Sequence, residues 1–286
     1  MKTSFSTVTI IAPGLLGASL GAALHRNQLV DRVIVWARRA EVRSECARLE
    51  WCDETTETVE ESVKDADLVV ICAPVSKIPV LAHQIKDHLK PGAIVTDVGS
   101  TKHKLQIKSE SALEGKGIFV GSHPMAGSEK SGHAHADETL FSGKPCFVTK
   151  GGQISKKAIE KVVGFWSALE MDVHVTDPEE HDQIVAFVSH LPHLTASGLS
   201  HVLSDPKYRH FTPFISTGFL DTTRVASGDL QMWRDIIREN REEILPALNE
   251  MIQTMESLRD HLQHGQIDAV MGMLEEGKSF RDDLVK

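Results

Sequence analysis

The stretch VTIIAPGLLGASLGAALHR, residues 8–26, decides the fold of the first half of the chain. Residues 8–11 are β-branched and mostly apolar, which predicts a short buried strand. A tight turn with two glycines follows, and an apolar helix is expected over residues 18–26. A strand, a glycine turn and a helix in this order are the context that a dinucleotide-binding fingerprint requires. We therefore expect this stretch to be the first unit of a parallel sheet.

The turn between strand and helix supplies candidate cofactor contacts. Gly14 would let the backbone approach a pyrophosphate, Gly17 would let the helix pack on the strand, and the helix start offers free N–H groups. Ala12 stands where a glycine begins the usual fingerprint, and Pro13 removes one amide donor. Such a turn can also serve packing alone. The predicted cofactor-binding residues of this loop are Gly14, Leu15, Leu16 and Gly17.

The second strand, residues 33–36, ends without the acidic residue that grips a ribose 2′-hydroxyl. Arg38 and Arg39 follow it, and no carboxylate stands before Glu41. Two guanidinium groups suit a 2′-phosphate by charge and by bidentate geometry, so the sequence favours NADP over NAD. The alternative is a solvated basic start of a helix.

Two further strands, residues 67–73 and 93–99, alternate with helical segments, which predicts a doubly wound α/β domain of the Rossmann type. The loops after these strands should meet the glycine turn at one edge of the sheet. Ala73 and Pro74 are therefore predicted to contact the cofactor. Ser100 is predicted to place its hydroxyl against the nicotinamide, although it could equally be a helix cap.

The stretch GSHPMAGSE, residues 121–129, follows an apolar run at residues 117–120. A strand that ends on a histidine held by a proline, with a small-residue turn closed by a glutamate, is typical of an active-site edge. Histidine can transfer protons near neutral pH, so His123 is the candidate acid/base of a nicotinamide-dependent enzyme. His133 and His135 are interpreted as a polar lip beside this turn.

A shift in composition near residue 176 predicts a domain boundary. Strands are expected at Pro145–Thr149 and Asp172–Thr176, with an amphipathic helix between them, and no strand pattern follows. We predict a dinucleotide-binding, Rossmann-like domain over residues 1–176 and an all-α domain over residues 177–286. The helical pattern at residues 230–258 is expected to be interrupted near Pro246.

Two motifs in the helical part carry candidate ligands. Pro192 lies inside a helical pattern, and the bend it causes could aim His190 at a cavity, unless His190 is a core histidine at a kink. His190 and His193 have a spacing that metals use, but no carboxylate or cysteine cluster joins them, so no metal is predicted.

The second motif is the loop-like stretch GFLDTTR at residues 218–224, which ends in Arg224. Its guanidinium could bind a substrate carboxylate with Asp221 orienting it, or the two could be a structural ion pair. Residues 233–236 and Asn240 could line the same region, but they are expected to serve packing.

The composition of the chain limits its expected partners and location. The 286 residues carry a net charge of -9, which argues against nucleic acid or an anionic membrane as the main partner. The four cysteines lack CxxC spacing, and neither a signal peptide nor an 18-residue apolar segment is evident. We expect a cytoplasmic protein of enzyme size.

Five motifs taken together resemble the prephenate/arogenate dehydrogenases of tyrosine biosynthesis, and the likeness covers nearly the whole chain. They are GLLGASL at 14–20, DVGSTK at 97–102, HPMAGSE at 123–129, SHLPH at 189–193, and GFLDTTR at 218–224 with WRDI at 233–236. The resemblance implies NAD- or NADP-dependent oxidative decarboxylation of prephenate or arogenate, and a homodimer formed through the helical domain.

The resemblance also implies roles for individual residues. His123 would hydrogen-bond the C4 hydroxyl of the substrate ring and help take its proton, and Ser100 would orient His123 beside the nicotinamide. His190 and Arg224 would hold the substrate from the helical side. The remaining predicted substrate contacts, at the pocket mouth, are Ser128 and Glu129.

Two alternatives remain open from the sequence. A β-hydroxyacid dehydrogenase shares the two-domain plan but usually relies on a lysine in the helical domain, and residues 179–224 contain only Lys207. A non-catalytic NADP-binding module would have the same first domain and no turnover. No residue distinguishes prephenate from arogenate.

Overall fold

A computed structural model describes residues 3–127, 132–152 and 154–285 of the chain. The chain forms two compact units, residues 1–241 and residues 242–286. The first unit holds both sheets and every helix up to α10, and the second holds two long helices. The predicted boundary after Thr176 coincides with the end of the last strand, and as a domain boundary it stays a prediction.

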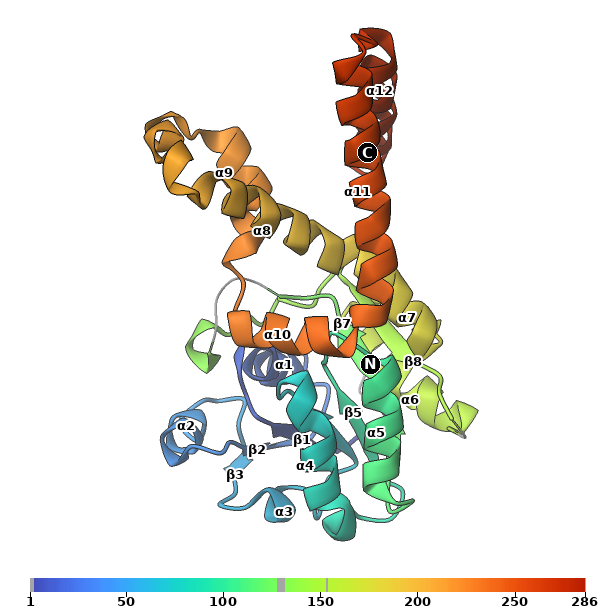
Figure 1. Ribbon diagram of the computed structural model, residues 1–286. Coiled ribbons are helices and arrows are strands. Elements are labelled where there is room, and N and C mark those ends of the chain that lie inside the picture. Colours follow the sequence, from blue (N-terminus) through green and yellow to red (C-terminus); the bar gives the residue numbers. More distant parts are fainter. Residues whose placement is uncertain (1–2, 128–131, 153, 286) are drawn as a thin grey trace. The chain divides into compact units, whose positions relative to one another are not determined.

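The first unit is built around a parallel sheet of six strands in the order β3-β2-β1-β4-β5-β6 (Figure 1). This order is that of a doubly wound dinucleotide-binding fold, so the predicted fold class is confirmed. The strands are β1 (Thr7–Ile11), β2 (Arg32–Trp36), β3 (Glu54–Thr55), β4 (Leu68–Ile71), β5 (Ile94–Asp97) and β6 (Ile118–Val120).

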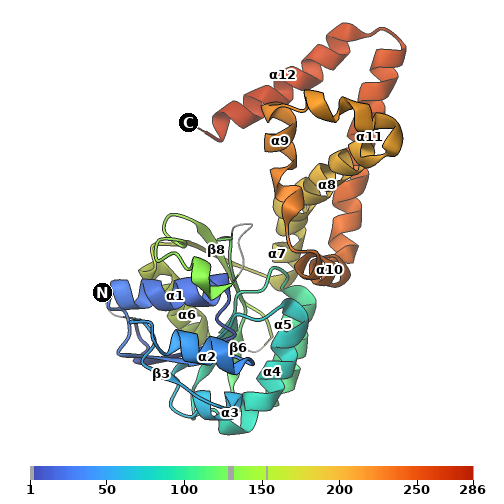
Figure 2. The same cartoon turned by 90° about the vertical axis from the view of Figure 1, so that its left-hand side faces the viewer.

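Helices cover both faces of this sheet, as Figure 2 shows for α1 and α6 on one side and α4 and α5 on the other. One core contains side chains of α1 (Leu15–Arg26), α2 (Ala40–Cys46) and α6 (Lys156–Ala168), including the fully buried Phe165 and Trp166. The other core contains side chains of α3 (Val59–Ser62), α4 (Ile78–Ile85) and α5 (His103–Leu113). The strands are apolar on both faces because both faces are buried.

A second, smaller sheet has the order β7-β8-β9, and its strands are β7 (Ser122–Pro124), β8 (Pro145–Thr149) and β9 (Asp172–Thr176). Here the prediction of a strand ending on His123 was wrong in detail. The apolar run forms β6, and His123 lies in the middle of β7, paired antiparallel with Phe147. The chain can turn between the two strands because Gly121 has no side chain: a Cβ there would lie 2.5 Å from Oγ1 of Thr149.

The described residues that follow Thr176 are helical or turns, which confirms the all-α class of this part. The elements in the first unit are α7 (Pro178–Val185), a π-helical turn (Ala186–His190), α8 (Leu191–Ser204), a 3-10 segment (Pro206–Phe214), α9 (Thr217–Thr223), a 3-10 turn (Arg224–Ser227) and α10 (Leu230–Glu239).

Two expectations about the helices were wrong. Residues 218–224, expected as a loop, lie mostly in α9, and Arg224 begins the turn after it. The break in the 230–258 pattern falls at Asn240, whose backbone N–H closes α10 on Ile236, while Pro246 lies inside α11.

The second unit consists of α11 (Arg241–Gln263) and α12 (Ile267–Asp283), joined by a turn in which Gly265 has φ 65°. Among the described residues, we find no helix with the length and apolar character needed to span a lipid bilayer.

Ala12 has a left-handed backbone conformation with φ 62°, at the position where the dinucleotide fingerprint usually has glycine. A Cβ in this region costs about 1–2 kcal/mol. We predict that Ala12→Gly raises the free energy of unfolding by about 1 kcal/mol in urea titrations. Ala22→Gly within α1 is the control and should lower it by about 1 kcal/mol. A destabilised Ala12→Gly protein would contradict the strain at this turn.

Candidate functional site

The carboxyl ends of four neighbouring strands lie in one row. Ile11 pairs with Trp36 on one side and with Ile71 on the other, and Ile71 pairs with Asp97. The loops after β1, β2, β4 and β5 therefore leave the sheet at the same edge, as the sequence predicted. In open parallel sheets ligands bind at this edge.

The two glycines of the first loop have different surroundings. A Cβ on Gly17 would lie 3.1 Å from Cγ2 of Ile10 and 3.2 Å from Cβ of Cys72, so this glycine lets α1 pack closely on the sheet. A Cβ on Gly14 would meet no atom within 4 Å, and its φ of -73° does not require glycine. Nothing among the residues that the structure describes requires glycine at position 14. The open space beside it, at the N-terminus of α1, suits a closely approaching phosphate.

Arg38 and Arg39 are exposed directly after β2, at the same edge. Arg43, which the sequence analysis did not select, donates from Nη1 to the carbonyl oxygens of Ala37, at 2.7 Å, and Arg38, at 3.2 Å. It pins the loop that carries the two arginines and adds a third positive charge. In the sequence, the only sign of this loop-fixing role was the position of Arg43, a basic residue one helical turn into α2. Ala73 is buried and Pro74 exposed in the loop after β4.

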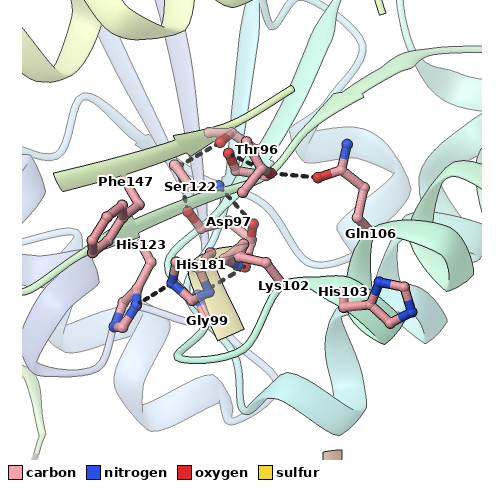
Figure 3. Close-up of polar contacts among 12 residues, drawn as sticks. Thr96, Asp97, Gly99, Lys102, His103, Gln106, Ser122, His123, Phe147 and His181 are labelled. Carbon is pink, nitrogen blue, oxygen red and sulfur yellow. Dashed lines mark hydrogen bonds and ion pairs between the residues drawn. The ribbon is translucent and has the colours of Figure 1, made fainter. Parts of the chain in front are cut away.

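The end of β5 is fixed by a fully buried ion pair. Oδ2 of Asp97 lies 2.5 Å from Nζ of Lys102 and accepts the N–H of Gly99 at 2.8 Å. Oδ1 of Asp97 accepts the N–H of Ser122 at 3.1 Å. The carboxylate thus joins β5 to β7, and it sets the position of the residue after Ser122, which is His123 (Figure 3).

His123 is 7% exposed and is hydrogen-bonded to another histidine. Its Nδ1 lies 2.9 Å from Nε2 of His181 (Figure 3). Nδ1 of His181 in turn lies 2.8 Å from Oδ1 of Asp182. We expected Ser100 to orient His123, but the structure gives Nδ1 of His123 to His181 instead. His181 and Asp182 were missed because nothing local marks them: they lie in an ordinary polar stretch of α7. Ser100, half-buried, follows β5 at the edge where the loops after β1, β2, β4 and β5 leave the sheet.

Burial keeps the histidines of this region neutral. The pKa of His123 is lowered well below its usual range by burial, and next by its neighbours His181, Lys102 and His190. Burial also lowers the pKa of His181 well below the usual range. A neutral imidazole can accept a proton, so His123 is suited to act as a base.

His190 closes the site from the helical side, at the end of the π-helical turn. Its Nδ1 lies 3.1 Å from Nδ2 of Asn240, and Asn240 also donates to the backbone oxygen of Asp182 at 2.9 Å. Asn240, expected to serve packing, therefore positions His190. Because an amide nitrogen donates to Nδ1, the proton of neutral His190 is on Nε2. That nitrogen is buried without a hydrogen-bond partner among the described residues, which is unusual for a buried polar group unless a ligand supplies one.

Arg224 and His193 lie in the helical part of the first unit. Arg224 is exposed, and the carbonyl of the next residue, Val225, lies 2.9 Å from Nδ1 of His193. His193 stacks on Trp233 with ring centroids 3.5 Å apart. Ser128 and Glu129 lie outside the described residues. In the part of the chain that the structure describes, no group of three or more His, Cys, Asp or Glu side chains could hold a metal ion.

Burial lowers the pKa of His190 to about 4, against the opposing charge of Asp182. The unfolded chain takes up a proton here below about pH 6.5, whereas the folded protein does not until about pH 4, so falling pH favours unfolding between these values. At about pH 5 this group alone should cost about 2 kcal/mol of stability.

We predict that His190→Gln loses about 2 kcal/mol less than the wild type between about pH 7.5 and pH 5, measured by urea unfolding at each pH. The exposed His201→Gln is the control and should match the wild type. Equal losses in His190→Gln and the wild type would contradict a buried neutral His190.

Comparisons with family models and with known proteins lead to prephenate dehydrogenases. A family model described as "Prephenate dehydrogenase, nucleotide-binding domain" matches residues 20–175, and one described as "Prephenate dehydrogenase, dimerization domain" matches residues 177–276. The prephenate dehydrogenase of Bacillus subtilis is 31% identical over 287 residues, which cover 99% of this chain and 77% of that protein.

Two solved structures are also similar. Prephenate dehydrogenase from A. aeolicus in complex with hydroxyphenyl propionate and NAD+ has a TM-score of 0.91 and 30% identity, covering 99% of this chain and 100% of that one. The Synechocystis arogenate dehydrogenase has a TM-score of 0.84 and 25% identity, covering 97% and 99%.

Proposed function

The chain belongs to the prephenate dehydrogenase family, and from this premise we propose how its own residues carry out the oxidative decarboxylation of prephenate or arogenate. It is a nicotinamide-dependent dehydrogenase with a nucleotide-binding domain. The observation that carries the proposal is the buried, neutral His123 at the cofactor edge of the sheet, near His190, whose buried Nε2–H has no partner within residues 3–127, 132–152 and 154–285.

In the proposed reaction, Nε2 of His123 accepts the proton of the C4 hydroxyl of the substrate as the ring carboxylate leaves as carbon dioxide. When bound, the nicotinamide supplies the oxidising power by taking hydride from C4. Ser100 contacts the nicotinamide side of the pocket. Loss of the carboxylate makes the ring aromatic, so the protein mainly has to place the groups and accept one proton.

The helical side would hold the substrate. His190 is buried and has an N–H donor that no group in the described part of the chain accepts, which suits a carboxylate or carbonyl oxygen. Arg224 is assigned to a substrate carboxylate because of its place in the GFLDTTR motif and because its turn is held by His193. Ser128 and Glu129 are assigned to the pocket mouth from the family resemblance.

The cofactor loop would consist of Gly14, Leu15, Leu16 and Gly17, with Ala73 and Pro74 beside it. The open position at Gly14 and the N-terminus of α1 support pyrophosphate binding there. We assign NADP rather than NAD because Arg38 and Arg39 are exposed where the ribose is expected and Arg43 pins their loop.

We also propose a homodimer formed through the helical domain. The match of residues 177–276 to a dimerization domain supports it. So do large apolar side chains that are 46–69% exposed on the two helices of the second unit, namely Ile252, Met255, Leu262, Met271, Leu274 and Phe280. A cytoplasmic location fits the four cysteines, all of which are free thiols.

We predict that His123→Asn binds NADP with unchanged affinity but turns over at least about 10²-fold more slowly than the wild type, because it loses the proton acceptor. Fluorescence titration with NADPH and steady-state rates with prephenate and arogenate give the two measurements. Near-normal turnover in this variant would remove His123 from the reaction.

We predict a preference for NADP in a four-way assay of prephenate and arogenate against NAD and NADP. Arg38→Ala combined with Arg39→Ala should raise the KM for NADP by about 10-fold or more and leave that for NAD nearly unchanged, since only NADP has the 2′-phosphate. The exposed Arg48→Ala is the control. An equal loss for both cofactors would refute the 2′-phosphate site, and no turnover in any arm would favour a non-catalytic binding module.

A further inference from the structure

Three buried side chains form a continuous hydrogen-bonded series that the proposed reaction does not yet use. His123 on β7 bonds to His181 on α7 at 2.9 Å, and His181 bonds to Asp182 at 2.8 Å. His181 is 0% exposed and Asp182 is 2% exposed. We call this series, His123, His181 and Asp182, the histidine relay; Figure 3 labels its two histidines.

The far end of the histidine relay is fixed by backbone groups. Oδ1 of Asp182 accepts the N–H of Lys102 at 2.7 Å, and Oδ2 accepts the N–H of His103 at 3.0 Å. These are the first amides of α5, where the helix dipole also favours a negative charge. Both oxygens of Asp182 face N–H donors, so both must accept hydrogen bonds. A carboxylate can accept through both oxygens, whereas the protonated oxygen of a carboxylic acid is a donor.

This anchor determines where each proton lies along the series. The carboxylate of Asp182 accepts, so Nδ1 of His181 carries a proton and Nε2 of His181 has a lone pair. That lone pair accepts from Nδ1 of His123, so Nδ1 of His123 carries the proton and its Nε2 has the lone pair. The opposite order would place a proton on Nε2 of His123 and leave no base there.

The central ring cannot turn away from this arrangement easily. Phe147, the partner of His123 across the β7–β8 ladder, meets the His181 ring edge-to-face with centroids 5.1 Å apart and planes at 88°. The His123 ring lies 5.1 Å from the same histidine at 65°. A fully buried ring between two others, with both nitrogens bonded, has one orientation that satisfies its hydrogen bonds.

We propose that His181 and Asp182 are positioning residues for catalysis: they hold His123 in the tautomer that has its proton on Nδ1, so that Nε2 can accept the substrate proton. This rests on the base role proposed above for His123. A relay of this kind has a known parallel in hydrolases, where an aspartate fixes the tautomer of a catalytic histidine and its loss as an acceptor costs about 10⁴-fold in turnover.

The competing explanation is purely structural, with Asp182 capping α5 and His181 filling space against Phe147. The two explanations predict opposite orders of kcat for His181→Phe and His181→Gln. His181→Phe keeps a ring against Phe147 but removes both nitrogens. His181→Gln packs less well, but its amide can accept from His123 through oxygen and donate to Asp182 through nitrogen, which preserves the direction of the histidine relay.

For His181→Phe we expect kcat to fall by about 10²-fold or more, with the KM for substrate within about threefold of the wild type. For His181→Gln we expect kcat within about tenfold of the wild type, as a rescue by a group of the same polarity. Near-normal kcat in His181→Phe, or a kcat in His181→Gln as low as in His181→Phe, would overturn the proposal.

The matched control is His174→Phe. His174 on β9 also bonds to an aspartate, Asp172, at 2.9 Å, and its ring centroid lies 6.1 Å from that of Phe147. It is exposed and is not part of the histidine relay. The same substitution here should leave kcat within about twofold of the wild type, which is the scatter expected for a change outside the site.

A second measurement decides the proposal without turnover. In ¹⁵N NMR spectra of histidine-labelled protein saturated with NADP near pH 7, the signals lost in His123→Asn identify His123. We expect a protonated Nδ1 and an unprotonated Nε2. A proton on Nε2, or on both nitrogens, would overturn the histidine relay. Absence of turnover in all four combinations of substrate and cofactor would instead refute the proposed reaction. The NMR result would then still test the histidine relay.

Discussion

The carboxylate of Asp97 links three segments that lie apart in sequence: the end of β5, the start of α5 and strand β7. It is fully buried with Lys102 and also accepts the amides of Gly99 and Ser122. Burying two charges costs several kcal/mol per ion, and it is tolerated only where further hydrogen bonds satisfy both groups. The Asp97 carboxylate has such bonds, to the amides of Gly99 and Ser122, and the second of them fixes the place of His123, one residue after Ser122.

Buried hydrogen bonds also fix side chains on the helical side of the site. One dipeptide of α7, His181-Asp182, reaches both α5 and β7, and Asn240 at the end of α10 reaches Asp182 and His190. Ser76, near the start of α4, donates to Asp235 of α10 at 2.6 Å. The helices therefore complete the environment of His123 with buried imidazoles rather than with exposed charges, and burial keeps these imidazoles uncharged at neutral pH by lowering their pKa.

The sequence was informative where structure depends on local pattern. β1, the glycine turn, β5 and β9 follow from runs and turns of a few residues, and the family, fold class and enzyme class drawn from the motifs are confirmed. It failed where long-range contacts decide. His181 is 58 residues from His123, and Ser76 is 159 from Asp235, so no periodicity marks either pair. The roles of single site residues, the NADP preference and the boundary at residue 176 stay predictions.

The central claim is that Nε2 of His123 accepts the proton of the substrate hydroxyl. The most direct measurement is a crystal structure of the protein with NADP and hydroxyphenyl propionate, whose phenolic oxygen stands in for the C4 hydroxyl. The account predicts that Nε2 of His123 lies within about 2.6–3.2 Å of that oxygen, with Nδ1 still on His181. A phenolic oxygen bound by another side chain, with Nε2 of His123 turned away from it, would contradict the account.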